Sequence, residues 1–407
     1  MFTITFITCA MNLTRATATT IVSILENVLL ENRFADKVIE KAFKENTKRR
    51  NPDRQFIAQT TDGIIRNYRL LYTAAKCEKD NFWKILGAWL MLNKIPMPRW
   101  EEFGKLNSNN LTKNAREAKA IRKIRESVPD WLDEQGEKEL GTAWDKEIKA
   151  LNENPRVILR VNTLKTTPEE LIEALRNESV EVNTDENFPD ALFLPRWKNV
   201  FRLQAFKDGL FESQDAASQE VARFLEVTPG MRVIDACAGT GGKTLHLAAL
   251  MNNKGRIIAM DTEEWKLTEL KLRARRCGVS NLELKTIDSS KVIKRQANTA
   301  DRLLLDVPCS GLGVLRRNPD AKWKLTPEYL EKLHQLQEKI INEYCVLLKK
   351  DGLMVYSTCS ILPSENQLQV EKFMSQHPDF KLIREKTILP SEGLDGFYMA
   401  LIKKTEA

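Results

Sequence analysis

A regular alternation of strand and helix patterns from Gly209 onward strongly constrains the fold of this chain. Short apolar runs predict strands at 232–235, 256–261, 282–286, 302–306 and 353–357. Helical patterns separate these runs, with the longest at 263–277 and 327–348. Strands that alternate with helices in this way build a parallel sheet covered on both faces. We therefore predict a doubly wound α/β domain whose last two strands, near 380–383 and 397–402, form an antiparallel edge.

The residues ahead of this region indicate two further parts. Apolar stripes with helical spacing predict an all-helical domain over residues 1–125, for example at Ile21, Ile24, Leu25, Val28 and Leu29. A strand pattern at 156–162, a helix start at Thr166 to Glu170 and a strand near 191–194 predict a small α+β subdomain. With its linker helices this subdomain spans 126–205, which leaves 206–407 for the α/β domain. A chain of 407 residues fits such a division, because single cores stop growing well below this size.

Basic residues concentrate in the helical part of the chain. Residues 1–127 carry 23 Lys and Arg against 13 Asp and Glu, whereas the remainder is slightly acidic. This asymmetry favours a polyanionic partner, and Lys48-Arg49-Arg50 and the run from Lys113 to Arg125 are candidate phosphate contacts. A solvated helical surface explains each cluster equally well. We interpret Trp83, Trp89 and Trp100 as core residues rather than base-stacking platforms.

Composition excludes several classes of protein. No apolar run reaches the roughly 20 residues of a membrane span, and the apolar first ten residues lack a basic start and a cleavage site, so that Met11 is a second candidate initiator. Seven cysteines without CxxC pairs fit neither a disulfide framework nor a zinc site. His246, His334 and His377 have no partners at metal-ligand spacing. We expect a cytoplasmic monomer that uses neither a membrane nor a metal.

A glycine-rich turn follows the first predicted strand of the α/β domain. Its central residues are Cys237, Ala238, Gly239, Thr240, Gly241, Gly242 and Lys243. A phosphate-binding Walker loop requires glycine where Cys237 stands. A dinucleotide fingerprint that begins at Gly239 requires glycine where Thr244 stands. The turn therefore predicts a backbone that approaches a ligand closely without gripping its phosphates.

Carboxylates at the ends of the next two predicted strands narrow the choice of ligand. Asp261 is placed to accept both hydroxyls of a ribose, and Asp288 to accept from an adenine amino group. Each of them alone fits a turn or cap better than a ligand contact. At successive strand ends beside the glycine turn they favour an adenosine, and S-adenosylmethionine over NAD or ATP.

Two cysteines also follow predicted buried strands. Cys309 stands in Asp306-Val307-Pro308-Cys309, and Cys359 in Ser357-Thr358-Cys359-Ser360. Because parallel strands end at one edge of a sheet, we expect both thiols to meet in one cleft. Cys277 and Cys345 fall on predicted helices and are expected to pack in the core.

These segments resemble the signature motifs of the RNA cytosine-C5 methyltransferases of the Sun type. The resemblance rests on the glycine turn, on Asp306-Val307-Pro308-Cys309-Ser310-Gly311 and on the segment from Tyr356 to Asn366. It extends to Gln214-Asp215-Ala216, Arg316-Arg317-Asn318-Pro319-Asp320 and Lys322-Trp323, and covers roughly residues 125–405. The N-terminal helices are similar to the NusB-like RNA-binding domain of bacterial ribosomal members. One departure is Ala238-Gly239-Thr240, where the family usually reads Ala-Ala-Pro; we expect cofactor binding to survive it.

The resemblance implies a fold, a reaction and residue roles. The fold is the class I S-adenosylmethionine-dependent methyltransferase sheet, and the reaction is methylation of a cytidine at C5 in 16S, small-subunit ribosomal RNA. Cys359 adds to C6 as the nucleophile, Asp306 holds N3 or the exocyclic amine and lies beside the cofactor, and Cys309 assists release. Lys243 stabilises the cofactor carboxylate or a thiolate, and Arg160 is a candidate RNA contact.

Three alternatives stay open. The cysteine roles are exchanged if the chain follows the DNA cytosine-C5 methyltransferases, whose nucleophile lies in a Pro-Cys motif like Pro308-Cys309. The substrate is transfer RNA if the chain follows other relatives with the same motifs. A third hypothesis is an RNA-binding ribosome assembly factor whose methyltransferase fold is catalytically vestigial.

Overall fold

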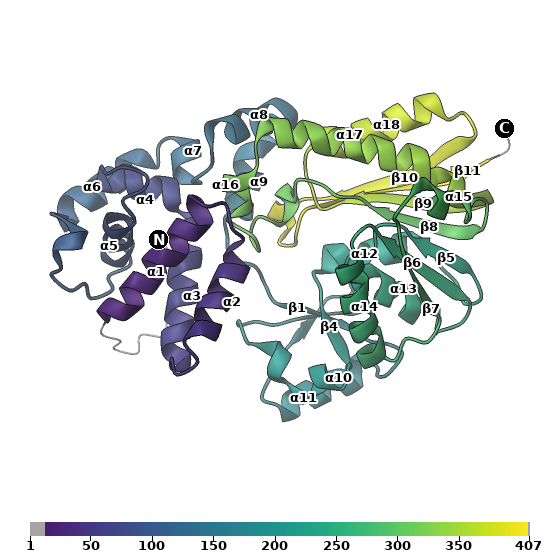
Figure 1. The fold of residues 1–407 in the computed structure, drawn as a ribbon, viewed down its shortest axis with the longest axis horizontal. Coiled ribbons are helices and arrows are strands. Elements are labelled where there is room, and N and C mark those ends of the chain that lie inside the picture. The colour runs from purple at the N-terminus through teal and green to yellow at the C-terminus, as the bar shows by residue number, and fades with distance from the viewer. Residues whose placement is uncertain (1–12, 406–407) are drawn as a thin grey trace. The chain divides into compact units, whose positions relative to one another are not determined.

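The computed structural model describes residues 13–405, which form two compact units (Figure 1). The first contains the described part of Met1–Asn152 together with Leu315–Thr326. The second contains Glu153–Val314 and the described part of Pro327–Ala407. Met11 and the apolar residues before it lie outside the described residues. Among residues 13–405, no helix combines the length and the apolar character needed to cross a membrane.

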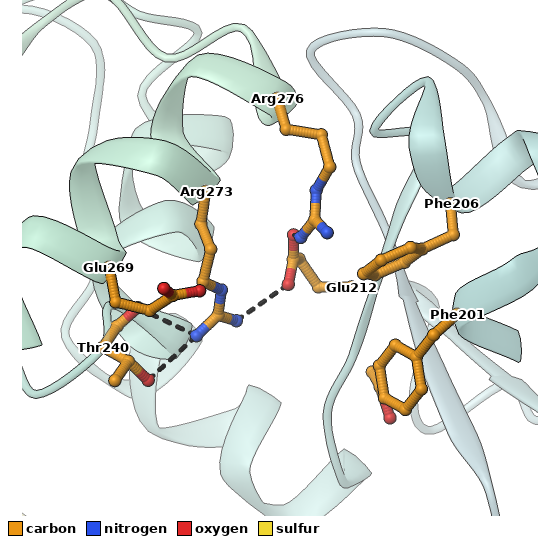
Figure 2. A pocket seen from close by; sticks show the side chains of 8 residues that line it. Phe201, Phe206, Glu212, Thr240, Glu269, Arg273 and Arg276 are labelled. Atoms are coloured by element: carbon orange, nitrogen blue, oxygen red, sulfur yellow. Dashed lines mark hydrogen bonds and ion pairs between the residues drawn. The ribbon is translucent and has the colours of Figure 1, made fainter. Parts of the chain in front are cut away.

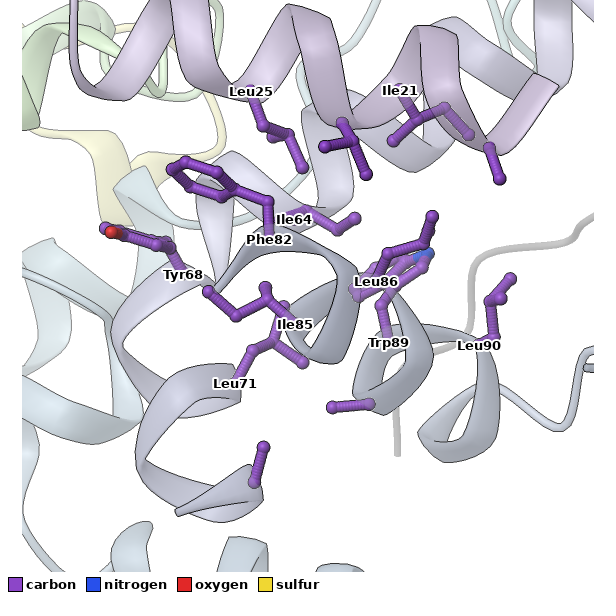
Figure 3. Packing of buried hydrophobic residues seen from close by; sticks show 14 of the residues in the cluster. Ile21, Leu25, Ile64, Tyr68, Leu71, Phe82, Ile85, Leu86, Trp89 and Leu90 are labelled. Atoms are coloured by element: carbon purple, nitrogen blue, oxygen red, sulfur yellow. The ribbon is translucent and has the colours of Figure 1, made fainter. Parts of the chain in front are cut away.

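The first unit is helical. Its helices are α1 (Arg15–Leu29), α2 (Ala35–Glu45), α3 (Asn51–Arg66), α4 (Tyr68–Ala75), α5 (Phe82–Leu92), α6 (Ser108–Ala118), α7 (Arg122–Arg125), α8 (Asp130–Leu140), α9 (Ala143–Leu151) and α16 (Ala321–Lys324). The predicted stripe on α1 packs against α3 and α5 in one apolar core, which Figure 3 shows around Leu25, Ile64 and Trp89. Trp89 is fully buried, and Trp83 and Trp100 pack against the same core, which confirms their interpretation as core residues.

A segment from the second half of the chain completes this helical unit. Lys322 is buried, and its Nζ donates hydrogen bonds to the carbonyls of Arg66 at 2.8 Å and Glu126 at 3.1 Å. The indole nitrogen of Trp323 donates to the Ile65 carbonyl at 3.0 Å. The Arg316-to-Trp323 stretch, which the sequence associates with the methyltransferase motifs, thus belongs to the compact unit of the helices.

The second unit opens with a small α+β region. Its antiparallel strands have the order β2-β3-β1-β4: β1 (Ile158–Val161), β2 (Asn183–Thr184), β3 (Ala191–Phe193) and β4 (Phe211–Ser213). The helices α10 (Pro168–Asn177) and α11 (Gln204–Lys207) accompany this sheet. A capping box of Thr167 and Glu170 begins α10 where the sequence predicted a helix start.

A seven-stranded sheet forms the rest of the second unit. Its order is β10-β11-β9-β8-β5-β6-β7, with β5 (Arg232–Asp235), β6 (Arg256–Asp261), β7 (Leu282–Thr286), β8 (Ala300–Asp306), β9 (Leu348–Thr358), β10 (Phe380–Ile388) and β11 (Phe397–Lys404). The five strands β9, β8, β5, β6 and β7 are parallel to one another, and β11 is antiparallel to both of its neighbours, β9 and β10. This confirms the predicted doubly wound sheet with an antiparallel edge.

Helices cover both faces of this sheet. They are α12 (Ala216–Phe224), α13 (Gly242–Leu250), α14 (Glu264–Cys277), α15 (Ser290–Lys294), α17 (Pro327–Tyr344) and α18 (Gln367–Gln376). Leu304 of β8 packs in the core of α12 and α13, whereas its neighbours Leu303 and Leu305 pack in that of α17 and α18. Strands buried on both faces explain the continuous apolar runs. The predicted helix 327–348 ends at Tyr344, because a 3₁₀ turn at Cys345–Leu347 follows it.

Candidate active site

The strand order reverses between β5 and β8, and the candidate site lies at the carboxyl ends of these strands. In open α/β sheets, ligands bind at such switch points. Asp235 ends β5, Asp306 ends β8, and Thr358 ends the neighbouring strand β9. The glycine turn after β5 and the two cysteine motifs after β8 and β9 therefore meet at one edge.

The two predicted cysteines lie side by side. Asp306 of β8 and Ser357 of β9 are paired in register, so the segments that carry Cys309 and Cys359 begin side by side at the same edge of the sheet. Their sulfur atoms are 3.3 Å apart, and both residues are partly exposed. This distance confirms the expectation that the two thiols meet; neither of them lines the cavities described below.

A buried glutamate fixes the loop that carries Cys309. Glu365 has no exposed surface and accepts hydrogen bonds from the Ser310 amide at 2.8 Å, the Ser310 hydroxyl at 2.5 Å and the Gln337 amide at 3.0 Å. The Gln337 amide also donates to the Pro308 carbonyl at 3.0 Å. The loop after β8 is therefore tied to the segment that follows Cys359.

The two thiols differ in their electrostatic surroundings. The hydrogen bond with Cys359, burial and the negative charge of Glu365 together raise the pKa of Cys309 well above its ordinary value. Cys309 is therefore a protonated thiol at neutral pH. Cys359 instead interacts electrostatically with Lys243.

Asp306 and Lys243 form an ion pair beside the cysteines. The Lys243 ammonium lies 2.6 Å from Oδ2 of Asp306, and the Ser357 hydroxyl donates to Oδ1 at 2.9 Å. Burial disfavours the charged amine, but the Asp306 carboxylate outweighs this effect and holds the pKa of Lys243 above its ordinary value. Lys243 also lies 5.1 Å from the ring centroid of Phe397. The pair supplies a fixed cation and a carboxylate at the cleft.

The glycine turn has a backbone that other residues cannot replace. Gly241 adopts a φ of 91°, and a Cβ at this position would lie 2.0 Å from Cδ1 of Leu270. The Gly239 amide donates to Oδ2 of Asp261 at 2.9 Å. From behind, Arg160 donates to the Gly242 carbonyl at 2.5 Å. The turn is thus held open toward the cleft by contacts to its back.

A cavity of about 300 Å³ lies in front of this turn. Its lining includes most of the predicted cofactor residues: Cys237, Ala238, Gly239, Thr240, Gly242, Lys243 and Asp306. Its other lining residues are Ser213, Gln214, Ser218, Asp235 and Arg273, of which the motif segments contain Gln214 and Asp235, although neither was assigned a cofactor role. Burial raises the pKa of the Cys237 thiol well above its ordinary value, so this sulfur is unsuited to nucleophilic chemistry.

Three of the predicted cofactor residues do not line this cavity. Gly241 packs against Leu270. Asp261 is buried and binds backbone amides, accepting from Gly239 and, at 2.9 Å, from Glu263. Asp288 is exposed and accepts a hydrogen bond from the Ser289 hydroxyl at 2.9 Å. The roles of Asp261 and Asp288 toward a nucleoside remain predictions.

Asp235 is a cavity residue that sequence reasoning missed. The Thr244 hydroxyl donates to Oδ2 at 2.7 Å, whereas Oδ1 is buried without a hydrogen-bond partner. Burial raises the pKa of this carboxyl group to about 7, and the nearby charge of Asp306 acts in the same direction. The available signal was its place at the end of a buried strand directly before the glycine turn.

The residues at the cavity fit S-adenosylmethionine in chemical character. This molecule carries two cationic groups, a sulfonium and an ammonium, and one carboxylate. Asp235 offers an unused carboxyl oxygen to a cation, and Lys243 offers a positive charge to a carboxylate. A polar cavity bounded by a close glycine backbone suits such a ligand.

The structure corrects one expectation about RNA contacts and leaves a second one open. Arg160 is only 2% exposed and braces the glycine turn, so it is not a surface contact for RNA. Within the run from Lys113 to Arg125, several cations form ion pairs: Lys113 with Glu117, Arg122 with Asp133 and Glu137, Lys123 with Asp130, and Arg125 with Glu126 and Asp145. The contact of this run with phosphates therefore stays a prediction.

The remaining predicted core residues are buried as expected. Cys277 and Cys345 are 2% and 4% exposed, which confirms their packing in the core. His246 is buried, with Nε2 at 3.1 Å from Asp190. Among residues 13–405, no group of three or more His, Cys, Asp or Glu side chains is arranged to hold a metal ion.

Comparison with known proteins identifies the family. Residues 222–403 match the model of the 16S rRNA methyltransferase RsmB/F family, and residues 128–200 match its ferredoxin-like domain. A probable ribosomal RNA small subunit methyltransferase B from Synechocystis is 36% identical over 298 residues, which cover 68% of this chain and 67% of the relative. The chain belongs to the RsmB/F family. It therefore has a methyltransferase fold whose methyl donor is S-adenosylmethionine.

Solved structures show the same fold as this RsmB/F member. The crystal structure of PH0851 superposes with a TM-score of 0.80 at 25% identity and covers 97% of this chain and 100% of its own. A methyltransferase homolog protein from Pyrococcus horikoshii superposes with a TM-score of 0.62 at 26% identity, covering 70% of this chain and 97% of its own. The chain spans about two thirds of the length of the curated relatives that it matches.

Proposed function

We propose that this RsmB/F member methylates C5 of a cytidine in small-subunit ribosomal RNA through a covalent cysteine adduct. The observation that carries the proposal is the pair of thiols 3.3 Å apart, beside the Lys243–Asp306 ion pair at the cofactor cavity. C5 of cytosine is too weak a nucleophile to attack a sulfonium methyl group unaided. A thiol that adds to the neighbouring carbon solves this problem.

The residues divide the reaction between them. The Cys359 sulfur bonds to C6, and the electron pair of the C5–C6 double bond becomes available at C5. Asp306 holds N3 or the exocyclic amine and so stabilises charge on the ring. Bound S-adenosylmethionine would supply the methyl group that C5 takes up, with cleavage of the sulfonium–methyl bond and departure of S-adenosylhomocysteine. Loss of the C5 proton to a base then restores the double bond and expels the Cys359 thiolate.

The electrostatic surroundings support Cys359 rather than Cys309 as the nucleophile. Lys243 carries a positive charge close to Cys359, whereas Glu365 places a negative charge near Cys309. A thiolate is the reactive form of cysteine, and a cation favours it. Cys309, held as a thiol 3.3 Å from the Cys359 sulfur, is placed to donate a hydrogen bond to the Cys359 thiolate as it leaves, while a separate base takes the C5 proton.

The assignment is tested by adduct formation with RNA that contains 5-fluorocytidine, from which the C5 substituent cannot leave. We expect Cys359→Ala to abolish both methylation and the adduct. Cys309→Ala should accumulate a trapped adduct even on ordinary RNA. Cys77→Ala, at a half-buried cysteine of the helical unit, is the matched control and should behave as wild type. An adduct in Cys359→Ala that is missing in Cys309→Ala would exchange the two roles.

The RNA class is tested in cells. Bisulfite sequencing of ribosomal and transfer RNA from a deletion strain should show the loss of one cytosine mark in small-subunit ribosomal RNA. Loss of a transfer RNA mark alone would replace the proposed substrate. Failure to bind S-adenosylmethionine in calorimetry would instead favour an assembly factor without catalysis. The proposal places the reaction with ribosomal RNA in the cytoplasm.

We propose RNA binding for the NusB-like helical unit as well. Lys48 and Lys113 are exposed cations of the two basic clusters. Each phosphate contact contributes about 0.7–0.9 to the slope of log affinity against log salt concentration. Lys48→Gln and Lys113→Gln should each lower this slope by about that amount. Unchanged slopes in both variants would mean that Lys48 and Lys113 contact solvent and not RNA phosphates.

A further inference from the structure

A second cavity of about 510 Å³ adjoins the cofactor cavity, and the proposed reaction leaves its aromatic side chains unused. It is lined by Phe201, Phe206, Glu212, Ser213, Thr240, Glu269, Arg273 and Arg276. Ser213, Thr240 and Arg273 line both cavities, so the two spaces are neighbours within the second unit. Figure 2 shows arginines of α14 on one wall and two phenylalanines on the other.

Three of the four charged side chains of this cavity, Glu212, Arg273 and Arg276, bind one another or the protein backbone. Buried Glu212 accepts hydrogen bonds from Arg273 at 2.7 Å and from Arg276. Arg273 also donates to the carbonyl and hydroxyl oxygens of Thr240 at 2.8 and 3.0 Å (Figure 2). With Glu269 the lining carries two positive and two negative charges. A balanced, prearranged polar wall suits a neutral planar ligand better than a phosphate group.

The opposite wall offers an aromatic surface. The Arg276 guanidinium lies 3.9 Å from the ring centroid of Phe206 and covers that ring. Phe201 contacts Phe206 at a steep angle, with a centroid distance of 5.1 Å, and is 58% exposed. An exposed ring beside a polar cavity is an arrangement on which a nucleobase stacks.

The segment around Phe201 is strongly basic. Residues 195–207 contain no Asp or Glu, and Arg196, Arg202 and Lys207 are exposed. Trp197, in the same segment, is 68% exposed. The Lys198 ammonium donates hydrogen bonds to the carbonyls of Glu178 and Ser179, so it is already bound within the protein. Exposed aromatics among cations are typical of surfaces that bind single-stranded nucleic acid.

We propose that the Phe201 cavity holds one unpaired base of the RNA substrate next to the methylated cytidine. The base stacks on Phe201, and Arg196, Arg202 and Lys207 contact the adjoining phosphates. A base that enters a cavity has left its helical stack, so the site selects a single-stranded or opened region. This inference rests on the proposed RNA substrate and adds a second binding position beside the cofactor cavity.

The test uses the full chain and a fluorescein-labelled ten-residue oligocytidylate. Phe201→Ala should weaken its binding by about 5- to 150-fold, the range for loss of one stacked base. Phe201→Trp keeps a stacking surface and should stay near wild type. Ile383→Ala, at an exposed apolar residue of the edge strand β10, is the control and should change nothing. Arg202→Gln and Lys207→Gln should each reduce the salt slope by about 0.7.

Methylation of a small-subunit ribosomal RNA transcript separates the possible outcomes. For Phe201→Ala we expect a raised KM for RNA, an unchanged kcat and an unchanged calorimetric affinity for S-adenosylmethionine. Unchanged oligocytidylate binding would overturn the inference while leaving the proposed function intact. Weaker S-adenosylmethionine binding with normal RNA binding would also overturn it, because the cavity would then hold part of the cofactor. If the wild type methylates no RNA, the stacking effect on oligocytidylate still supports the binding position.

Discussion

Replacing Glu365 tests whether one buried carboxylate positions the Cys309 loop. In Glu365→Ala the Ser310 amide loses its acceptor, and the Gln337 amide keeps only the Pro308 carbonyl. A buried donor without a partner costs about 1–3 kcal/mol. The one lost methylene group adds about 0.8 kcal/mol. We therefore expect a destabilisation of about 2–4 kcal/mol, a large part of the 5–15 kcal/mol typical of a folded protein.

Hydrogen exchange of the Ser310 amide measures this effect locally. A loss of about 3 kcal/mol in the opening free energy corresponds to exchange faster by about two orders of magnitude. Glu365→Gln keeps the shape and an acceptor oxygen, so its exchange should stay close to that of wild type. Glu371→Ala, at an exposed glutamate of α18, is the matched control. Equal protection of Ser310 in Glu365→Ala and wild type would refute the reasoning.

Three further predictions follow from buried charged groups. Burial raises the pKa of Asp235 to about 7, so this carboxyl group contributes about 4 kcal/mol less to stability at pH 8 than at pH 4; in urea unfolding, the stability of Asp235→Asn minus that of wild type should rise by about 4 kcal/mol from pH 4 to pH 8. Burial lowers the pKa of His246 to about 4, so this side chain contributes about 3 kcal/mol less to stability at pH 4 than at pH 7; the stability of His246→Gln minus that of wild type should rise by about that amount as pH falls from 7 to 4 in the same measurement. Arg160→Met should weaken S-adenosylmethionine binding in calorimetry, because the Gly242 carbonyl loses its donor, and should leave RNA affinity unchanged; the reverse result would restore Arg160 to the RNA surface.

The sequence predicts the large sheet well because its strands are buried on both faces. A continuous apolar run such as Arg256–Asp261 has nearly the same limits in pattern and structure. Motifs at the ends of such strands must meet, and the cysteine pair illustrates this. Short edge elements such as β4 carry no comparable pattern over their three residues, and the sequence analysis did not predict it.

Contacts across the fold explain what the sequence could not show. Arg160 reads as a polar residue in a short strand, but its neighbour in the pairing with β4 is Glu212, and both are buried. Nothing in the sequence around Lys322 indicates that this lysine is buried. Its hydrogen bonds go to carbonyl groups more than 190 residues earlier in the chain. Asp235 is only the last residue of a predicted strand in the sequence, which does not reveal that the carboxyl group is buried and that its Oδ1 accepts no hydrogen bond. In each case a distant partner decides the role.

The two thiols show how such distant partners can assign chemistry. In the sequence, Cys309 and Cys359 occupy equivalent places after neighbouring strands, and their roles are open to exchange. In the structure their electrostatic partners differ, because Cys359 interacts with the charge of Lys243 from the glycine turn and Cys309 with that of Glu365 from the following segment. A cation favours the thiolate and an anion opposes it. This asymmetry supports attack by Cys359 and release assisted by Cys309, and exchanging the two charges should exchange which sulfur reacts first.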